Sequence, residues 1–255
     1  MALTTLIGPD TGPIGAAIPP ARGWDDPRGW DDPRGREDVR GWAGQPAAGR
    51  LAKRALDVTA ALVLLALAVP MLAVLTAVLK VRTGGPVLFR QVRVTGRGRT
   101  AVILKLRTLS QHGDADTRWS VDEQRVPAMQ RWLRTTHLDE LPQLLNVLRG
   151  DLSLVGPRPE RPYFAERFGR EIPGYRDRHR MRAGLTGWAQ VNGLNGDTSI
   201  AERVRYDNHY IDNWSLRLDL VVLARTLGLI SRSLGRAAAQ PTERPVLRAG
   251  QPPAA

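Results

Sequence analysis

The sequence predicts a membrane-associated α/β domain of α+β character, with one apolar helical segment, one β-hairpin and amphipathic helices at the membrane surface. Three observations support this fold class. Val58 to Leu79 is apolar enough for a membrane, two β-rich runs flank a turn between residues 87 and 107, and aromatic residues recur at helical spacing after residue 205. The expected divisions are a disordered arm (1–50), a membrane helix (51–82), a globular unit (83–230) and a basic tail (231–255).

Charge and composition limit the classes of partner. The chain has 255 residues, room for one sizeable domain with extensions, and a formal net charge of +12. Such a balance favours polyanionic partners: nucleic acid, anionic lipid headgroups or phosphorylated substrates. The absence of cysteine excludes disulfides and cysteine-based metal sites, and the 4 histidines lack the spacing of a zinc site.

The first 50 residues are rich in glycine, proline, aspartate and arginine. Arg22–Pro27 is repeated directly as Arg28–Pro33 and then decays. A hexad of this composition is too short and too polar for a solenoid repeat, so we interpret the arm as disordered. Its Trp24, Trp30 and Trp42 are expected to be solvated within that arm, and contact with a membrane interface is the alternative.

The apolar segment, Val58 to Leu79, would be roughly 33 Å long as a helix, enough to cross a hydrocarbon core of about 30 Å. Pro70 lies near its middle, where it kinks a helix and leaves two halves of roughly 17 Å. Both flanks are basic, so the positive-inside rule gives no direction; the cations are Arg50, Lys53, Arg54, Lys80 and Arg82. A hairpin that enters and leaves on one face and a kinked single span both fit, and a buried core helix is a third interpretation.

From residue 84 the pattern is that of a globular unit. Val87–Val94 and Thr100–Arg107 flank a Thr-Gly-Arg-Gly turn and predict a β-hairpin. In the second run, apolar residues alternate with Lys105 and Arg107, which places these two cations together on one face. They form either a solvated strand face or contacts to a diphosphate.

The second half of the chain predicts mainly helices. Residues 129–134 end one helix, residues 160–180 are partly helical, and residues 183–195 form a tight glycine-rich loop around a Trp. Leu216–Ile230 is strongly apolar with a few charges, so this helix can lie on the bilayer surface. No structure is predicted after it.

A capping box, Ser199 with Glu202, marks the start of a further helix. Along this helix Tyr206, Tyr210 and Trp214 recur at i, i+4 and i+8 and form one stripe. Such a stripe is typical of core packing, and beside a membrane it can also be an interfacial belt.

Two adjacent acids, Asp139 and Glu140, carry the main chemical signal. Thr136 and Pro142 fit a helix start around them, so the simplest interpretation is that the acids cap a helix. Neighbouring carboxylates repel, however, and both ionise readily only beside a cation. Mg²⁺ takes one or two carboxylates with phosphate oxygens, and an Asp carboxylate can attack phosphorus directly, so we expect phosphoryl-transfer chemistry. The nearby arginines that can clamp phosphate are Arg134, Arg149 and Arg158.

Several motifs together resemble those of a known family. They are KRALD at 53–57, KLRT at 105–108, LDELPQLLNVLRGDLSLVGPRPERP at 138–162, GLTGWAQVNG at 184–193, and YD at 206–207 followed by NWS at 213–215. Over about residues 50–230 the chain resembles the bacterial sugar transferase family, the monotopic polyprenyl-phosphate phosphoglycosyl transferases. Its ERP and NWS motifs resemble the hexose-1-phosphate branch, in a short form.

This resemblance implies a reaction. Family members transfer a sugar 1-phosphate from a UDP-sugar to undecaprenyl phosphate on the cytoplasmic face of the inner membrane, use Mg²⁺ and release UMP, which initiates exopolysaccharide, O-antigen or glycoconjugate assembly. The matching positions make Asp139 the nucleophile of a covalent phosphosugar-aspartyl intermediate and Glu140 a metal ligand. The residues expected to bind phosphate or substrate are Lys105, Arg107, Arg134, Arg149, Arg158 and Asp207. The resemblance also favours the re-entrant hairpin, broken at Pro70.

Four positions depart from the family pattern. Leu106 stands in the middle of a motif usually written Lys-Phe-Arg, an apolar exchange of little consequence. Val69 stands where Ser usually precedes the Pro, Ala183 stands where Pro usually precedes Gly-Leu-Thr-Gly, and Asn195 lies where an Arg often follows Val-Asn-Gly. Because Ala183 and Asn195 lie in the glycine-rich loop at 183–195, a weaker hold of that loop on the substrate, or a different sugar preference, would follow.

Two other functions are compatible with the sequence. A membrane-tethered nucleic-acid-binding protein fits the basic pI, but neither a helix–turn–helix nor aromatic residues interleaved with basic ones on a sheet are evident. A catalytically inactive scaffold of a polysaccharide assembly complex would keep the fold, although the intact acid pair argues against it. The expected partners are therefore a UDP-sugar, undecaprenyl phosphate and the lipid bilayer, with no nucleic acid and with a homodimer left open.

Overall fold

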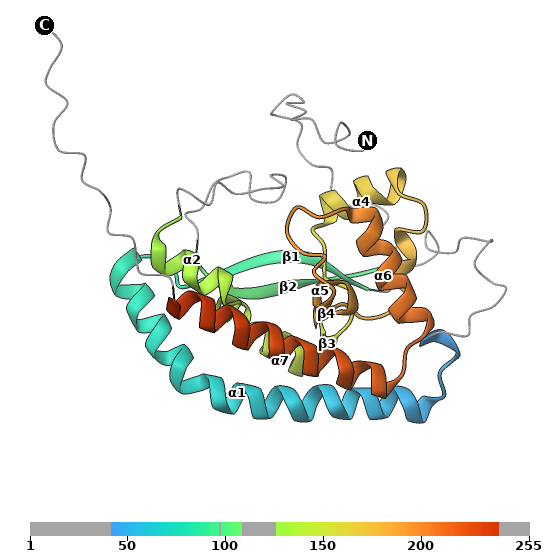
Figure 1. The fold of residues 1–255 in the computed structure, drawn as a ribbon, viewed down its shortest axis with the longest axis horizontal. Coiled ribbons are helices and arrows are strands. Elements are labelled where there is room, and N and C mark those ends of the chain that lie inside the picture. Colours follow the sequence, from blue (N-terminus) through green and yellow to red (C-terminus); the bar gives the residue numbers. More distant parts are fainter. Residues whose placement is uncertain (1–41, 97, 109–125, 240–255) are drawn as a thin grey trace, which may run out of the picture.

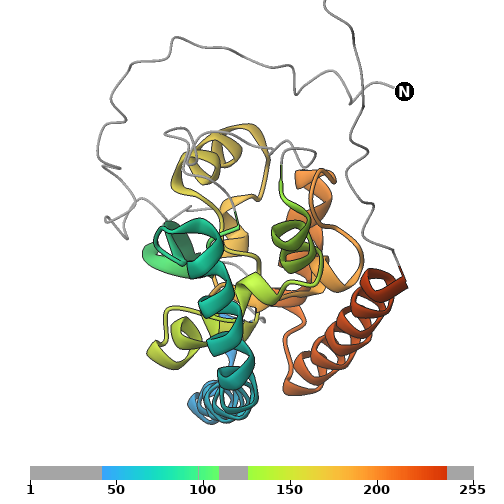
Figure 2. The ribbon, with the colours of Figure 1, turned by 90° about the vertical axis from the view of Figure 1, so that its left-hand side faces the viewer.

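The computed structural model describes residues 42–96, 98–108 and 126–239. Its helices are α1 (Ala47–Thr83), α2 (Ala128–Thr135), α3 (Gln143–Arg149), α4 (Pro162–Glu171), α5 (Trp188–Val191), α6 (Ile200–Asp212) and α7 (Leu216–Ala239), with short 3₁₀ turns η4 (Trp42–Gly44), η6 (Leu138–Glu140) and η7 (Arg176–His179). Its strands are β1 (Leu88–Gly96), β2 (Arg99–Leu106), β3 (Ser153–Val155) and β4 (Gly184–Thr186). This mixture of helices and strands, with one long apolar helix, confirms the α/β character of the predicted class. Figures 1 and 2 show the first part of α1 along the lower edge of the molecule.

Helix α1 continues through Pro70 and ends at Gly84, whose φ of 64° is a left-handed cap that suits glycine. It is long and apolar enough to cross a membrane, and only 11% of its most apolar window is buried. In Figure 1 the helix first follows the lower edge and then turns upward in its last part, toward the end of β2. The helix thus changes direction without reversing, which leaves the hairpin and the kinked span as predictions.

Two small sheets form the strand layer. Strands β1 and β2 pair antiparallel, from Leu88 opposite Leu106 to Val94 opposite Thr100, which confirms the predicted hairpin. Strands β3 and β4 pair parallel, and β4 lies within the predicted glycine-rich loop. Gly96, with a φ of 107°, ends β1 against the backbone of residues 181–182, where an added Cβ would collide with the carbonyl of Met181.

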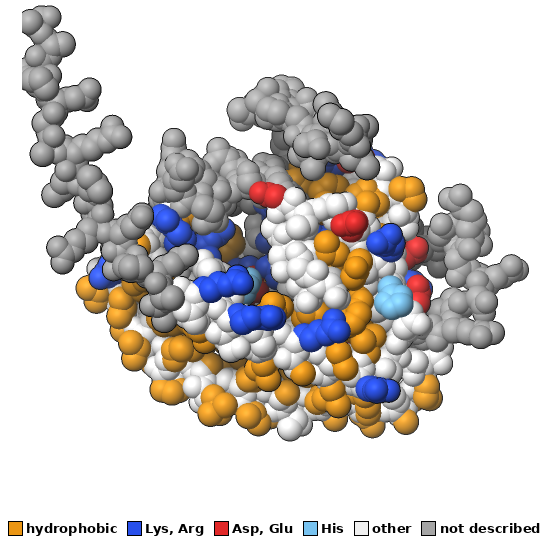
Figure 3. Space-filling view, in the orientation of Figure 1, with side chains coloured by type: hydrophobic (Ala, Val, Ile, Leu, Met, Phe, Trp, Pro, Cys, Tyr) orange, Lys and Arg blue, Asp and Glu red, His pale blue; other side chains and the backbone are white. Residues whose placement is uncertain are grey.

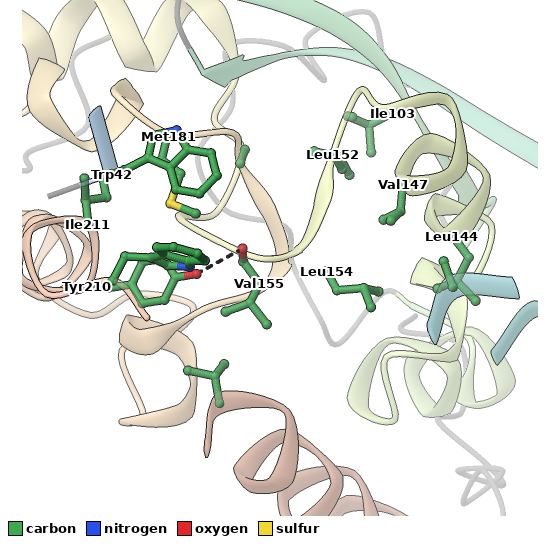
Figure 4. Packing of buried hydrophobic residues seen from close by; sticks show 14 residues of the cluster. Trp42, Ile103, Leu144, Val147, Leu152, Leu154, Val155, Met181, Tyr210 and Ile211 are labelled. Atoms are coloured by element: carbon green, nitrogen blue, oxygen red, sulfur yellow. Dashed lines mark hydrogen bonds between the residues drawn. The ribbon is translucent and has the colours of Figure 1, made fainter. Parts of the chain in front are cut away.

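The main core lies between α1, α3, β3, α6 and α7. Figure 4 shows Tyr210 inside it, with its hydroxyl oxygen 3.3 Å from the carbonyl oxygen of Val155. Trp214 packs edge-on against Trp42, with ring centroids 4.9 Å apart. The aromatic stripe therefore serves core packing, as predicted.

The prediction that Trp42 is solvated was wrong. Only 9% of this residue is exposed, because η4 folds back before α1 and places the indole against Trp214. Trp24 and Trp30, to which the same prediction applied, lie outside the described residues.

Two other expectations about helix ends have different outcomes. The capping box at Ser199 is confirmed, since its hydroxyl accepts the backbone N–H of Glu202 at 3.3 Å. The capping box at Thr136 is wrong: its hydroxyl donates to the carbonyl of Trp132 at 2.8 Å and so closes the end of α2. Helix α7 also extends beyond the predicted end at Ile230, to Ala239.

The surface has an apolar face along two helices. In Figure 3 apolar side chains cover the lower face, over α1 and α7, and lysines and arginines lie in a row above them. Leu67 on α1 is 72% exposed, and Leu220, Leu227 and Leu234 repeat every seven residues along α7 with their side chains exposed. A patch of this extent on two helices is typical of a membrane-contacting surface.

Candidate active site

The acid pair lies in a tight turn between two helices. Asp139 and Glu140 occupy η6, after His137, whose φ of 58° makes it the one non-glycine residue with a positive φ in the described chain. Both acids are 7% exposed. Helix α3, which follows the turn, is fixed to β2 because Asn146 accepts the N–H of Leu104 at 3.1 Å. The turn is therefore placed beside the end of β2.

Glu140 binds two cations from different elements. Its Oε1 accepts from Lys105 Nζ at 2.6 Å, on β2, and from Arg158 Nη2 at 2.7 Å, in the loop after β3. Burial alone would raise the pKa of Glu140, but Arg158 and Lys105 hold it well below its ordinary range. Burial lowers the pKa of Lys105 and Glu140 opposes that shift, so the contact is an ion pair whose members stabilise one another.

Asp139 has a different environment from its neighbour. Burial, followed by the charge of Glu140, raises its pKa to about 6, although Lys105 and Arg134 act in the other direction. Within the described part of the chain, no side chain or backbone N–H donates a hydrogen bond to this carboxylate. A buried carboxylate that accepts no hydrogen bond from the described residues, beside an acid neutralised by two cations, has the features of a reactive group.

A buried ion pair binds the backbone of Arg158. Arg178, in η7, binds Asp207 Oδ2 through Nε at 2.9 Å and Nη2 at 2.7 Å, and the same Nη2 donates to the carbonyl of Arg158 at 3.1 Å. Asp207 thus acts on the backbone of Arg158 through Arg178 and has no direct contact with the acid pair. The sequence prediction placed Asp207 at the site but missed Arg178.

Arg93 is a second cation that sequence reasoning missed. It lies on β1 and donates to Gln91 Oε1 at 2.7 Å and to the carbonyl of Pro159 at 3.0 Å. Burial lowers its pKa to about 10. The sequence signal for Arg93 was only that Arg90 and Arg93 lie among apolar residues on a predicted strand, and the signal for Arg178 was only the Arg-rich run at 176–182. Neither signal identifies which arginine faces inward.

A small pocket is lined by Arg158 but by neither acid of the pair. Its polar wall combines residues from four segments: Arg158, Glu160, Arg178, Gln190, Arg203 and Asp207. Gln190 belongs to the glycine-rich loop, and its Oε1 is buried without a hydrogen-bond partner among the described residues. The loop is tight as predicted, because a side chain at Gly184 or Gly187 would collide with the backbone of Gly156.

The predicted phosphate-binding residues are only partly brought together. Lys105 and Arg158 contact Glu140, and Arg134 lies near enough to affect the charge of Asp139. Arg149 is exposed at the far end of α3, roughly 10 Å along the helix from the turn. Arg107 has a buried Nε without a partner in the described segments and no contact with either acid there.

The acid pair could hold a metal ion only if phosphate or water oxygens completed its coordination. Within the described residues, no three His, Asp or Glu side chains are grouped so that they could hold a metal ion. Mg²⁺ binds one or two carboxylates and completes its octahedron with water and phosphate oxygens, so two acids are enough if a diphosphate is present. The oxygens of Asp139 have no hydrogen-bond partner in the part of the chain that the structure describes, whereas those of Glu140 already face Lys105 and Arg158.

Comparison with known proteins gives a consistent result. Residues 48–233 match the model of the family described as bacterial sugar transferase. A Caulobacter vibrioides protein named UDP-glucose:undecaprenyl-phosphate glucose-1-phosphate transferase is 45% identical over 183 residues, which are 69% of this chain and 68% of that protein. An Escherichia coli protein of the same name is 38% identical over 184 residues, 70% of this chain and 40% of the relative.

A third relative differs in the sugar that its name carries. An Aeromonas hydrophila protein named UDP-N-acetylgalactosamine-undecaprenyl-phosphate N-acetylgalactosaminephosphotransferase is 37% identical over 187 residues, 72% of this chain and 44% of that protein. The matched region is thus less than half of the Escherichia and Aeromonas proteins. Relatives of similar identity carry different sugar names, so identity alone does not assign the sugar.

Proposed function

The chain belongs to the bacterial sugar transferase family, and from this membership we propose that it transfers a sugar 1-phosphate from a UDP-sugar to undecaprenyl phosphate and releases UMP. One observation of the site carries the proposal. Glu140 is neutralised by Lys105 and Arg158, while Asp139 beside it accepts no hydrogen bond from the described residues and has a pKa raised to about 6 by burial. At neutral pH Asp139 is therefore largely ionised and able to attack.

Two displacement steps account for the reaction. In the first, an oxygen of Asp139 bonds to the phosphorus that carries the sugar, and the P–O bond to UMP breaks, with UMP taking the electron pair. In the second, a phosphate oxygen of the lipid attacks the same phosphorus, and the bond to Asp139 breaks and restores the carboxylate. Both steps depend on positioning and on stabilisation of charge on the phosphoryl oxygens.

The cations around Glu140 supply that stabilisation. Arg158 offers a planar fork suited to phosphate oxygens, and Lys105 offers a point charge. We propose Mg²⁺ as the cofactor, with Glu140 among its ligands, where it would neutralise the diphosphate of the substrate. Because Glu140 already binds two cations, such coordination requires Lys105 or Arg158 to move part of its contact onto the substrate phosphates.

The membrane arrangement is part of the proposal. We place α1 as a re-entrant helix bent near Pro70, with the catalytic unit on the cytoplasmic face of the inner membrane and the exposed leucines of α7 in the interface. The chain has no cysteine, so Gly44→Cys and Arg99→Cys variants can be labelled singly in intact cells and inverted vesicles. Labelling of both positions from the cytoplasmic side is expected, and labelling from opposite sides would establish a single span.

The activity itself has a direct test. The purified full chain is incubated with a panel of UDP-sugars, Mg²⁺ and undecaprenyl phosphate, and UMP release is measured. Without lipid acceptor, one sugar phosphate per chain should attach to the peptide that contains Asp139, as detected by mass spectrometry. If no UDP-sugar gives UMP, the proposed function is wrong; if UMP is released without an adduct on that peptide, the covalent mechanism is wrong.

A further inference from the structure

The start of α1 carries a motif that the transfer mechanism does not use. Lys53, Arg54 and Asp57 lie at one end of the apolar helix, where basic residues are expected to face lipid headgroups. Instead, Lys53 is 3% exposed and Asp57 is 2% exposed. Burial of charged groups requires compensating contacts, and the structure shows what those contacts are.

Asp57 and Lys53 bind strand β3. The single hydroxyl proton of Ser153 is shared by the two oxygens of Asp57, at 2.8 and 3.0 Å, and one of these oxygens also accepts the N–H of Leu154 at 3.0 Å. Lys53 Nζ donates to the carbonyl of Val155 at 3.1 Å and to Asp219 Oδ2, on α7, at 2.7 Å. Two side chains of α1 thus contact every residue of this strand.

Arg54 binds the helix that follows the acid pair. Its two terminal nitrogens donate to the carbonyls of Val147 and Leu148, at 2.7 and 2.8 Å. These carbonyls belong to the last turn of α3, where helical backbone acceptors lack partners within the helix. The same turn of α1 therefore contacts the chain both shortly after Glu140 and shortly before Arg158.

Strand β3 leads directly to the cation that binds Glu140. Two residues, Gly156 and Pro157, separate Val155 from Arg158, and the N–H of Gly156 donates to the carbonyl of Thr186 at 2.9 Å. Strand β3 is therefore held on two sides: β4 pairs with one edge, and the side chains of Lys53 and Asp57 on α1 bind it from another direction. Displacement of β3 would move Arg158 away from the carboxylate of Glu140.

We propose that Lys53, Arg54 and Asp57 form a positioning latch that couples the membrane helix to the active site by holding β3 and α3, and thereby Arg158, against Glu140. The latch rests on the proposed transferase function. It does not touch the substrate, and it acts through the geometry of Arg158. Contact with protein rather than with lipid headgroups distinguishes these residues from the exposed cations Lys80 and Arg82 at the other end of α1.

The test uses turnover of the full-length membrane protein and one matched control. Asp57→Asn keeps a similar volume and removes the charge, and Ser153→Ala removes the hydroxyl from the strand side without touching α1. Asn208→Ala serves as the control, because Asn208 also ties a helix to a backbone carbonyl, that of Gly174 at 3.0 Å, but at a distance from the acid pair. UMP release is measured well below the unfolding temperature of each variant.

A positioning role predicts a loss of kcat that depends on Arg158. Asp57→Asn should lower kcat roughly 10- to 100-fold and Ser153→Ala by a smaller factor, since small misplacements of catalytic groups have effects of this size. In the background of Arg158→Lys, which lacks the fork, Asp57→Asn should cause less than about a twofold further loss. The control Asn208→Ala should keep the wild-type kcat.

Three outcomes decide the matter. If the wild type releases no UMP, the proposed function is wrong and the latch has nothing to position. If the wild type turns over and Asp57→Asn and Ser153→Ala match the Asn208→Ala control, the latch is wrong although the function holds. If Asp57→Asn lowers kcat by the same factor in the Arg158→Lys background as in the wild type, the three residues contribute to stability alone and do not act through Arg158.

Discussion

The molecule contains two buried clusters of acids and cations that differ in how fully their carboxylates are bonded. In the junction cluster (Lys53, Asp57 and Asp219), each carboxylate accepts several hydrogen bonds; Asp219 receives them from Lys53 Nζ, the Tyr210 hydroxyl at 2.6 Å and Trp214 Nε1 at 3.2 Å. In the acid-pair cluster (Lys105, Asp139, Glu140 and Arg158), Glu140 is bonded in the same way. Asp139 accepts no hydrogen bond from any other described residue.

This difference separates a structural network from a reactive one. A buried charge is tolerated when hydrogen bonds and a counter-charge replace water, and the junction cluster meets that condition. Burial raises the pKa of Asp219 as well, but Lys53 and the hydrogen bonds from Tyr210 and Trp214 oppose that shift. Asp139 receives no hydrogen bond from the described residues, and burial raises its pKa to about 6. An unsatisfied group in a well-formed site is available to bind something else, which here would be phosphorus or a metal ion.

The largest expected effect is on turnover at Asp139. Asp139→Asn should lower kcat by at least about 1,000-fold, because an amide cannot act as the nucleophile. The measurement is UMP release from the UDP-sugar that the wild type uses best, compared with Asp212→Asn, which neutralises an exposed aspartate on α6. Near-normal turnover of Asp139→Asn would show that the unsatisfied carboxylate is not the reactive group.

The next effect is on stability, and it concerns the other cluster. Asp219→Asn should reduce the free energy of unfolding by about 3 kcal/mol, because it removes one member of a buried ion pair and leaves Lys53 with a weaker partner. Thermal unfolding in detergent micelles, followed by circular dichroism, measures the change. An unchanged midpoint would mean that the junction cluster is not the stabilising network described above.

A third effect has the opposite sign and depends on pH. The pKa of Asp139, about 6, lies above its ordinary value of 3.8, so the folded chain holds this proton more tightly than the unfolded chain does. Its contribution to stability is therefore full below about pH 4 and is lost as the pH rises through about 6. Asp139→Asn avoids that loss, so its free energy of unfolding should exceed that of the wild type by up to about 3 kcal/mol at pH 7.

Unfolding of both proteins between pH 4 and 8, without divalent cations, checks this. The gap between them should widen from pH 4 to about 6 and then stay constant. A constant gap over the whole range would contradict the raised pKa of Asp139. Repeating the series with Mg²⁺ should narrow the gap at pH 7 if Asp139 lies beside the bound ion, since a nearby cation favours the ionised carboxylate.

Local patterns in the sequence predicted much of this architecture. The β1–β2 hairpin, the cap at Ser199, the core stripe of Tyr210 and Trp214, and the tight loop at 183–195 follow from alternation, turn residues and helical spacing within short windows. The specific motifs also predicted Asp139, Glu140, Lys105 and Arg158 as site residues, and the structure brings these four together. These signals need no knowledge of distant contacts.

The features that were missed depend on contacts between distant parts of the chain. Trp42 is buried only because Trp214 lies 4.9 Å away, and Arg178 is distinguished from its neighbouring arginines only by Asp207. The departure at Ala183 also has a consequence that only the structure shows. Its N–H donates to the carbonyl of Thr95 at 2.7 Å, a bond that the proline usual at this position could not make.

The smallest expected effect tests whether burial, and not the pairing of charges, separates the two clusters. Arg167 and Glu171 form an ion pair at 2.9 Å on α4, close in length to that of Lys53 and Asp219, but their side chains are 39% and 52% exposed. Arg167→Ala should therefore change the free energy of unfolding by only about 0.5 kcal/mol or less, because water screens an exposed pair. A loss as large as that of Asp219→Asn would show that ion pairs stabilise this fold wherever they lie, and the contrast between satisfied and unsatisfied buried acids would then lose its basis.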